Sequence, residues 1–226
     1  ITLSGGTPKT NYMFSAGYLN EEGLVKFTSF ERFSGRTNID SKVNEWLKTG
    51  LSVNFAANTS NTTSLREDAM GDSGYSNVFS TCALMAPIYP IYAKDANGKT
   101  VLDVNGDPKY DWGEDRAAGA AAGWNPLANL KEDKYSRTAD NVSGRSFVEI
   151  GGLKEGILQG LKLSVNYGFD YIMSKRKTYY NPNFGNGKTT KGYLGIRDDR
   201  TLSYTFNQLL TWNRTFGLHN IDFLAG

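Results

Sequence analysis

The stretch LKLSVNYGFDY, residues 161–171, decides the fold class of this chain. Every second residue is apolar or aromatic, and the residues between them are Lys, Ser, Asn, Gly and Asp. Such strict alternation is typical of a β-strand with one apolar and one polar face. The stretch is longer than the roughly 5–6 residues of an ordinary soluble strand, and a tilted strand crosses a bilayer with roughly 9–11. By itself it fits either a membrane-crossing strand or a long strand of a soluble β-protein.

The composition narrows the class of protein. The 226 residues are 39% hydrophobic and 13% aromatic, and the net charge is +2. No apolar run reaches the roughly 18 residues of a transmembrane helix, whereas a membrane-spanning strand needs only alternate apolar residues. The basic residues are dispersed, so the chain has no footprint for nucleic acid. A single cysteine, Cys82, excludes an intrachain disulfide framework, and a single histidine, His219, leaves little for metal or triad chemistry.

The same alternation recurs along the chain and predicts further strands. It is present at residues 11–20, 30–40 and 46–57, where aromatic or aliphatic side chains alternate with polar ones. Residues 145–153 show a weaker form of the pattern, and residues 200–216 show a long one. Repeated strands of this length favour a membrane barrel over a soluble sandwich.

Short and long connections take turns between the predicted strands. The short turns lie at about 5–10, 41–45, 154–160 and 216–220, and the longer segments lie at about 20–29, 58–143 and 174–199. A transmembrane β-barrel has this asymmetry, because its periplasmic turns are short and its outer loops are long. A loop as long as 58–143 would be unusual in a compact soluble domain.

We therefore expect an all-β fold: an antiparallel transmembrane β-barrel segment of about eight strands, the first and last partial, with long extracellular loops. The whole chain, 1–226, should be part of one outer-membrane β-barrel domain, with extracellular loops at about 58–143 and 174–199. Both ends fall inside alternating stretches, so we also expect the chain to be part of a longer protein.

Each predicted strand assigns its side chains to one of two surroundings. The residues expected to face lipid are Leu47, Leu51, Val53, Phe55, Leu161, Leu163, Val165, Tyr167, Phe169, Leu202, Tyr204, Phe206 and Leu210. The residues expected to face a wet lumen are Arg32, Arg36, Asp40, Asn54, Asn166 and Asp170. In a soluble β-protein the same polar residues would form the solvated face, so one strand alone does not separate the two interpretations.

Several short segments stand in the order in which a known family carries them. They are GGTPKTNY (5–12), GYLNEEG (17–23), FERFSGRTNID (30–40), WLKTGLS (46–52), APIYPIY (86–92), NGDP (105–108), YD (110–111) and NPL (125–127). Together they resemble the SusC/RagA family of TonB-dependent outer-membrane transporters, and the resemblance runs through most of the chain.

The resemblance implies a location in the bacterial outer membrane and a barrel of roughly 22 strands around an N-terminal plug. It also implies energy from the TonB system, a SusD-like surface lipoprotein over the outer mouth, and contact of the wall with outer-membrane lipid. The cargo would be large nutrients, either oligosaccharides or peptides. The plug is absent from this sequence, so the chain would supply barrel wall only. The lumen-facing residues would then contact the plug or water rather than cargo.

Aromatic and polar residues of the long loop are candidates for contact with cargo or with the lid. Sugar rings stack on aromatic faces, and their hydroxyls bond to amides and carboxylates. The candidates are Tyr89, Tyr92, Tyr110, Asp111, Trp112, Trp124 and Asn125. The alternative is that these residues pack the loop against itself or against the lipoprotein.

Other functions fit the sequence less well. A soluble or surface β-rich carbohydrate-binding module would place polar residues on both exposed faces of its sheet. Asp103 and Asp107 suggest a calcium loop, but Pro108 stands where an EF-hand needs glycine. Asp111 and Glu114 are spaced for an acid–base pair, yet nothing else in the sequence supports catalysis. We therefore expect no enzyme activity, no metal site and no cofactor.

Overall fold

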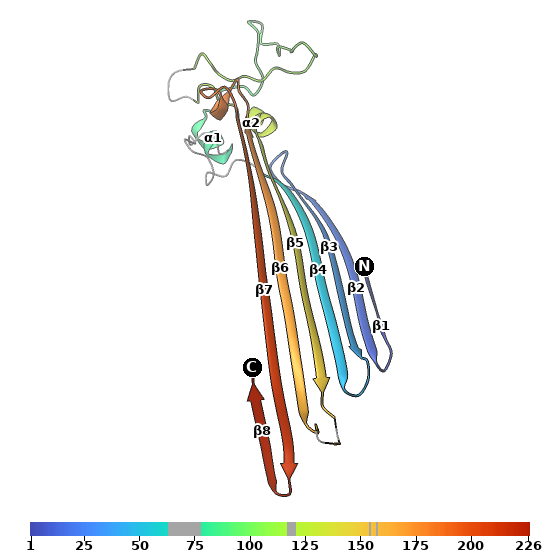
Figure 1. The fold of residues 1–226 in the computed structure, drawn as a ribbon. Coiled ribbons are helices and arrows are strands. Elements are labelled where there is room, and N and C mark those ends of the chain that lie inside the picture. The colour runs from blue at the N-terminus through green and yellow to red at the C-terminus, as the bar shows by residue number, and fades with distance from the viewer. Residues whose placement is uncertain (63–77, 117–120, 154, 157) are drawn as a thin grey trace.

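Eight antiparallel strands form one sheet in chain order (Figure 1). The computed structural model describes residues 1–62, 78–116, 121–153, 155–156 and 158–226. The strands are β1 (Thr2–Gly6), β2 (Thr10–Glu22), β3 (Ser29–Lys42), β4 (Leu47–Thr62), β5 (Lys134–Gly151), β6 (Leu161–Tyr180), β7 (Tyr193–Phe216) and β8 (His219–Ala225). Within these ranges, no helix has the length and apolar character needed to cross a membrane. The all-β antiparallel fold predicted from the alternation is confirmed.

Short and long connections lie at opposite ends of the sheet (Figure 1). At the lower end in the figure, residues 7–9, 43–46, 152–160 and 217–218 join neighbouring strands. At the upper end, the connections are residues 23–28, 63–133 and 181–192. The tightest turn is between β7 and β8, where Gly217 has a φ of 59° that favours glycine. The alternation of short and long connections follows the sequence prediction, except that the connection 152–160 at the lower end is longer than the connection 23–28 at the upper end.

The two longest connections are shorter than the alternation indicated. The loop expected at 58–143 is strand at both ends, and the connection itself spans 63–133. The loop expected at 174–199 spans only 181–192. The strands therefore continue toward the upper end of the sheet, and β7 is the longest of them (Figure 1).

Backbone pairing, rather than an apolar face, accounts for these added strand ends. Thr59 pairs with Thr138, and Lys175 pairs with Asp198, so polar residues lie where the lower strands carry apolar ones. Strands keep their ladder hydrogen bonds whatever their side chains, provided that neither face has to be buried. A search for period-2 alternation misses the ends of β4 and β5, because both faces are largely polar there.

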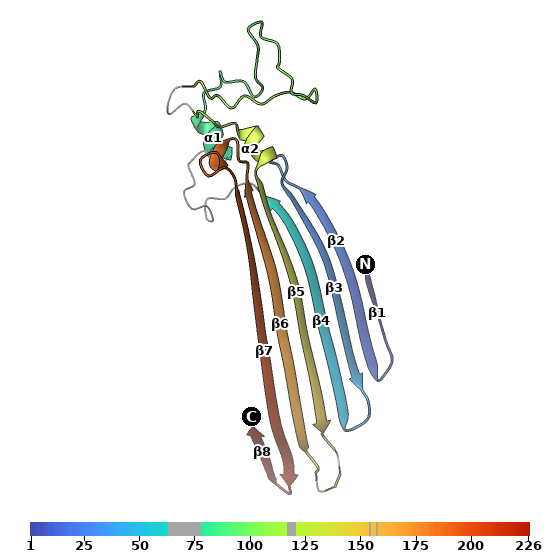
Figure 2. The same ribbon diagram turned by 45° about the horizontal axis from the view of Figure 1, so that its top comes forward.

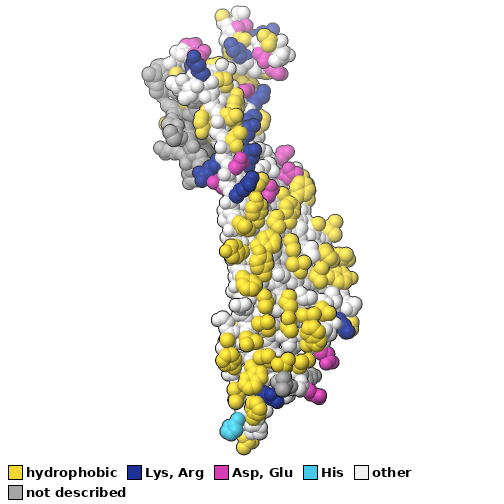
Figure 3. Space-filling view, viewed as in Figure 1, with side chains coloured by type: hydrophobic (Ala, Val, Ile, Leu, Met, Phe, Trp, Pro, Cys, Tyr) yellow, Lys and Arg dark blue, Asp and Glu magenta, His cyan; other side chains and the backbone are white. Residues whose placement is uncertain are grey.

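The register divides the strand residues into an apolar and a polar face. Val53 pairs with Gly144, which pairs with Phe169, and Phe169 pairs with Tyr204. Since directly paired residues point to the same side, this row and its neighbours place all residues expected to face lipid on one face. Figure 3 shows apolar side chains gathered over the middle of the sheet, with charged side chains toward its upper end.

One irregularity in the sequence turns out not to disturb the sheet. Gln208 and Leu209 interrupt the alternation of β7, which could indicate a bulge. Gln208 nevertheless pairs directly with Val165, and Leu209 pairs with Ser164, in an unbroken register. The interruption is therefore a change of side chain within a regular strand.

Buried side chains gather at the loop end of the molecule. Among the described residues, the buried apolar side chains are Trp112, Ala121 and Ala128 in the long connection and Tyr180 at the end of β6. α2 (Pro126–Glu132), which carries Ala128, lies at this upper end together with α1 (Val78–Leu84) and the short 3-10 helix η1 (Gly185–Gly187) (Figures 1 and 2). We call this packed region the loop base.

An extended arm, residues 86–112, projects from the loop base (Figures 1 and 2). Isolated bridges join Tyr92 to Tyr110, Lys94 to Thr100, and Leu102 to Pro108. The backbone pairing within the arm is limited to these isolated bridges.

Candidate functional site

The six residues expected to face the lumen lie on one face of the sheet. Arg36 pairs with Asn54, and the same row continues through Ser143 to Asp170. The row that contains Asp40 ends on Asn166 and Asn207 in the same way. Arg32 lies four residues before Arg36 on β3, and alternate residues share a face. The structure thus brings these residues together; that the face borders a lumen stays a prediction.

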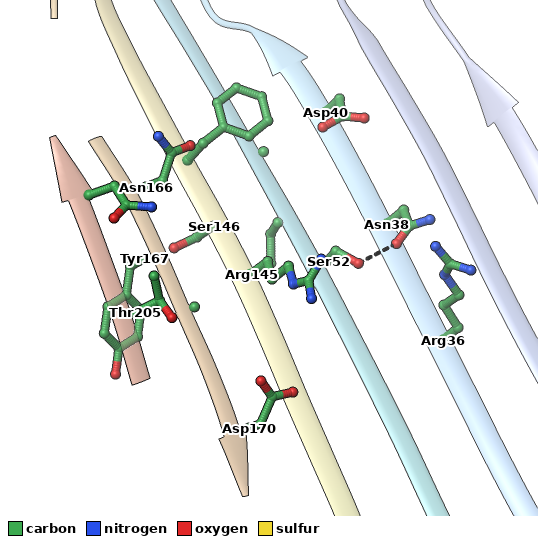
Figure 4. Close-up of a pocket in the computed structure, with 15 residues that line it drawn as sticks. Arg36, Asn38, Asp40, Ser52, Arg145, Ser146, Asn166, Tyr167, Asp170 and Thr205 are labelled. Carbon is green, nitrogen blue, oxygen red and sulfur yellow. Dashed lines mark hydrogen bonds between the residues drawn. The ribbon is translucent and has the colours of Figure 1, made fainter. Parts of the chain in front are cut away.

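A hollow on this polar face is lined by charged and amide side chains (Figure 4). Arg36, Asp40, Asn166 and Asp170 belong to it, and the sequence analysis did not single out Arg145, which also lines it. Arg145 and Asp170 lie on neighbouring strands, β5 and β6. The sequence did contain an indication of this. Arg145 lies two residues after Ser143 on β5, and alternate residues of a strand share a face, so Arg145 belongs to the polar face.

A second hollow adjoins the first one on the same face. Arg32, Asn54 and Asn141 line it, and Arg36 lines both. Asn54 Nδ2 donates a hydrogen bond of 3.4 Å to Ser143 Oγ. Polar side chains therefore cover this face over a continuous stretch of β3, β4 and β5.

A glycine and an aromatic ring shape the wall of the first hollow. A Cβ at Gly50 would come within 2.1 Å of the Phe147 ring and 2.4 Å of an Asp40 carboxylate oxygen. The absent side chain therefore leaves room for the Phe147 ring against β4, next to the Asp40 carboxylate. Ser52 Oγ donates a 2.7 Å hydrogen bond to Asn38 Oδ1 beside it (Figure 4). An apolar ring within a polar wall offers a surface on which a sugar ring or an apolar side chain can stack.

The charged groups of this hollow are available to water or a ligand. Arg36 and Arg145 are exposed, and so are Asp40 and Asp170. Within the described part of the chain, no ion pair joins any of these four groups to another residue. No cluster of three or more His, Cys, Asp or Glu among the described residues is arranged to hold a metal ion. The wall can therefore both donate and accept hydrogen bonds.

Asn125 has a structural role at the loop base. It is the N-cap of α2, and its Oδ1 accepts hydrogen bonds of 3.1 Å from the backbone N–H groups of Leu127 and Ala128. Its Nδ2 donates to the carbonyl oxygens of Ile91 and Asp111 at 2.8 and 2.9 Å. Asn125 is only 2% exposed, and its side chain ties the two ends of the arm to α2.

Trp112 and Asp111 also make contacts within the loops. The Trp112 ring stacks on Phe184 with centroids 4.3 Å apart, which joins the arm to the 181–192 connection. Asp111 forms a 2.7 Å ion pair with Arg116, and the Arg116 guanidinium lies 4.2 Å from the centre of the Tyr89 ring. Both residues therefore make packing contacts within the loops, and their contact with cargo or a lid stays a prediction.

The remaining aromatic candidates are partly exposed. Tyr92 and Tyr110 stack with centroids 5.4 Å apart at the root of the arm, and Lys131 Nζ lies 5.6 Å from the centre of the Tyr110 ring. Trp124 is half-buried near Gly185. These rings have surface left for cargo or a lid, and such contact stays a prediction.

The acidic turn of the arm has a simple backbone function. Asp103 Oδ1 accepts hydrogen bonds from the backbone N–H groups of Asn105 and Asp107 at 2.8 and 2.9 Å. This is an Asx-type turn, which explains an aspartate at that position without a bound cation. Asp95 makes the same arrangement with Asn97 and Lys99.

The chain is similar over its whole length to TonB-dependent receptors. It is 26% identical to TonB-dependent receptor P3 and to TonB-dependent receptor P26 of Formosa agariphila, and 22% identical to TonB-dependent receptor SusC of Bacteroides thetaiotaomicron. Each match covers 100% of the chain but only 20%, 20% and 22% of those relatives. The chain thus spans about a fifth of their length. No family model matches it.

Solved structures share the fold. The RagAB peptide importer in its 'closed-closed' state matches 95% of the chain with a TM-score of 0.64, and in its 'open-open' state 99% with a TM-score of 0.65. The identity is 24% and the coverage of the longer chain is 22% in both cases. The fold is therefore that of a stretch of bacterial outer-membrane β-barrel wall. Within this class the chain is SusC/RagA-like, which confirms the resemblance found in its sequence.

Proposed function

We propose that the chain forms part of the wall of a TonB-dependent importer that carries large nutrients across the outer membrane. The observation that carries the proposal is the continuous polar face through Arg36, Asn54 and Asp170, opposite an apolar face. A sheet that is polar on one side and apolar on the other suits a barrel that encloses water within lipid. The similarity to TonB-dependent receptors supports TonB as the energy source. The relatives are named as receptors and importers, which supports a role without catalysis.

The cargo and the partner are further parts of this proposal. The RagAB structures are of a peptide importer, so a peptide joins an oligosaccharide as candidate cargo. A SusD-like lipoprotein would cover the loop base, and a plug domain of the full-length protein would fill the barrel. The partly exposed Tyr89, Tyr92, Tyr110 and Trp124 would contact the cargo or the lid. Asn125 and Trp112 would hold those rings in position.

Two glycines offer a matched test of the two faces. A Cβ at Gly168 would meet nothing closer than 3.8 Å, and one at Gly35 nothing closer than 3.9 Å. Gly168 pairs with Arg145 on the polar face, and Gly35 pairs with Phe55 on the apolar face. Each position therefore accepts a small side chain without moving the backbone.

The experiment is labelling of the full-length transporter in outer-membrane vesicles with a hydrophilic maleimide. The native cysteines of the full-length protein, among them the exposed Cys82, are first replaced by serine. Gly168→Cys should then react readily, because it borders water, and Gly35→Cys should stay protected by lipid. Equal labelling of the two cysteines would contradict the wall assignment, and a chain that folds without detergent would support the soluble carbohydrate-binding module instead.

The arm tests orientation and the link to transport. An epitope tag after Asn97, at an exposed turn of the arm, should be reached by antibody on intact cells. Deletion of residues 93–109 removes the outer part of the arm and retains both Tyr92 and Tyr110. We expect this deletion to reduce growth on the cognate nutrient or capture of the lipoprotein. If antibody reaches the tag only after the outer membrane is broken, the arm lies on the periplasmic side and the orientation of the sheet is the reverse of the one proposed.

A further inference from the structure

The apolar face of β7 ends at a basic residue. On this face the side chains from Trp212 to Leu202 are apolar or aromatic apart from Gln208, and the next one is Arg200. At roughly 3.4 Å per residue, the backbone from Trp212 to Leu202 is about 34 Å long. A strand tilted by roughly 40° then spans about 26 Å across the membrane, which matches the roughly 25 Å height of the apolar band of a barrel. In a membrane-spanning wall, Arg200 therefore lies just beyond the band, at the depth of the lipid headgroups.

Three more basic residues lie beyond the apolar band on the same face. Met173 of β6 pairs directly with Arg200, and the next two side chains on that face of β6 are Lys175 and Lys177. Lys134 of β5 lies one level further on. All of these basic side chains are exposed, and Figure 3 shows Lys and Arg side chains above the apolar ones. We call Lys134, Lys175, Lys177 and Arg200 the basic collar.

The basic collar is only partly engaged by groups of the protein. Within the described part of the chain, no ion pair or hydrogen bond joins the side chains of Lys175, Lys177 and Arg200 to another residue. The ammonium group of Lys134 donates to the carbonyl oxygen of Lys131, which does not neutralise its charge. The donors of three collar residues are therefore open to an anion from outside the protein.

Carboxylates on the same face offset part of the positive charge. Asp198 pairs directly with Lys175, and Asp140 pairs directly with Met173. Among the described residues, neither carboxylate lies within ion-pair distance of a collar residue. Two carboxylates beside four basic groups leave an excess of positive charge on this face of β5, β6 and β7.

The same level of the sheet is acidic on its other side. The row of directly paired residues that contains Lys175 runs through β5 and β4 to Glu31 of β3. Glu31 Oε1 accepts a 3.1 Å hydrogen bond from the Tyr18 hydroxyl, and Glu22 of β2 lies one level further on. An anionic group near the upper edge of the apolar band is therefore attracted to β5, β6 and β7 and repelled by β2 and β3.

An amphiphile with an anionic head matches this arrangement. Directly below the basic collar, Leu202 and Tyr204 are 64% and 74% exposed and offer an apolar surface to acyl chains. Lys and Arg extend their charged ends from apolar surroundings toward a polar layer, and a guanidinium group binds phosphate through parallel N–H donors. The levels of Arg200 and Lys177 are about 14 Å apart along the strands, at roughly 3.4 Å per residue. The collar is therefore longer than one phosphate group and suits a headgroup with more than one.

We propose that the basic collar binds the phosphate groups of an anionic lipid in the outer leaflet, with the acyl chains of that lipid on the apolar face below. This inference rests on the proposed importer function, which places the upper end of the sheet at the outer leaflet. It goes beyond that function because the lipid binds the outside of the wall and not the face that borders the lumen. Arg200 and Lys175 hold the phosphate nearest the bilayer, and Lys177 and Lys134 hold the one further out.

The test is lipid binding to the purified full-length transporter in detergent, measured by native mass spectrometry. The probes are bisphosphorylated lipid A, phosphatidylethanolamine, and glucosamine 1-phosphate, which has no acyl chains. Lipid A should bind roughly tenfold more tightly than phosphatidylethanolamine, and added salt should reduce the difference. Glucosamine 1-phosphate should not displace lipid A, because a phosphate without chains gains nothing from the apolar face.

The decisive variant carries Lys175→Gln, Lys177→Gln and Arg200→Gln. It should lose most of the preference for lipid A while its affinity for phosphatidylethanolamine stays the same. The matched control carries Arg137→Gln, Arg176→Gln and Arg197→Gln. The control removes as many positive charges from the polar face of β5, β6 and β7 and should keep the preference. Heat-modifiable migration on gels checks that each variant forms a barrel.

Three results would overturn the proposal. They are equal affinities for lipid A and phosphatidylethanolamine, a preference for lipid A that survives in the collar variant, and displacement of lipid A by an equal concentration of glucosamine 1-phosphate. The last result would reduce the basic collar to a site for free phosphate. Labelling of Gly168→Cys but not of Gly35→Cys in the same protein separates these failures from a failure of the importer function, because that contrast does not depend on the collar.

Discussion

Tyr167 in the middle of the sheet is 46% exposed, whereas Trp112 in the loop base is 8% exposed. Tyr167 has an apolar row around it, with Leu51 and Phe206 on the same face, yet these neighbours leave its ring open to the surroundings. Trp112 instead lies parallel to Phe184, with 4° between the ring planes. Two large aromatic side chains of one chain are thus stabilised in different ways.

The difference shows which solvent each region is built for. The sheet presents its apolar side chains outward, so their burial depends on an apolar medium outside the protein. The loop base removes its apolar side chains from water by packing them on protein atoms, as a soluble domain does. The effect of a substitution in the sheet on stability should therefore depend on the surrounding lipid. The effect of a substitution in the loop base should depend on the protein contacts that it removes. The predictions below test this division.

The largest effect is expected where a charge enters the apolar face. Val165→Arg should destabilise the assembled full-length barrel by about 2–4 kcal/mol, because the guanidinium would sit near the middle of the bilayer. Asn166→Arg, on the adjacent residue but the polar face, should cost less than about 1 kcal/mol. Urea unfolding of the two variants in lipid vesicles measures the difference. Equal losses of unfolding free energy in the two variants would show that the two faces have the same surroundings.

A medium effect is expected at the capping residue of the loop base. Asn125→Ala removes the cap of α2 and both side-chain bonds to the ends of the arm, and should loosen the loop base by about 1–2 kcal/mol. Hydrogen exchange of residues 86–132 in the folded transporter should rise.

The matched control for that variant is Asn97→Ala, at an exposed turn of the arm, which should leave hydrogen exchange of the loop base unchanged. The unfolding midpoint of the barrel should also stay the same in Asn125→Ala. If Asn125→Ala lowers the unfolding midpoint of the barrel as well as the protection of the loop base, the sheet and the loop base unfold as one cooperative unit. The two regions would then not be stabilised independently.

The smallest effect is expected at an exposed ion pair. Lys188 Nζ lies 2.7 Å from Glu114 Oε1, and both side chains are more than half exposed. Glu114→Gln should therefore cost no more than about 0.5 kcal/mol and should make protease cleavage of the arm insensitive to salt. A large rise in cleavage would mean that this ion pair, and not the Trp112 stack, joins the two connections.

The membrane-crossing parts of the strands could be predicted because lipid imposes a pattern on the sequence. Phe55, Phe169 and Leu202 fall on one face by alternation alone, and their pairing confirms it. The upper ends of β4 and β5 could not be found in this way, because largely polar residues occupy both faces there. The Asn125-Pro126 pair is a recognisable helix start in the sequence, because asparagine is a favoured N-cap residue and proline is favoured at the first helical position.

For the candidate contact residues, too, the residue type in the sequence did not determine the surroundings of the side chain. Their types, aromatic and amide, were suited to a ligand, and the same types are suited to a packed loop. Only the folded arm shows that Asn125 and Trp112 are turned inward while Tyr92 and Tyr110 keep exposed surface. Arg145 was missed because its strand has a weak apolar pattern.

The sequence by itself determined the fold class, the parity of each membrane-crossing strand and the alternation of short and long connections. These properties are local, since an apolar medium on one side and water on the other select every second residue. The tertiary structure alone decided the register between strands, and with it the hollow around Arg36 and Arg145. Pairing joins residues that lie far apart in the chain, and no local pattern encodes which of them will stand side by side.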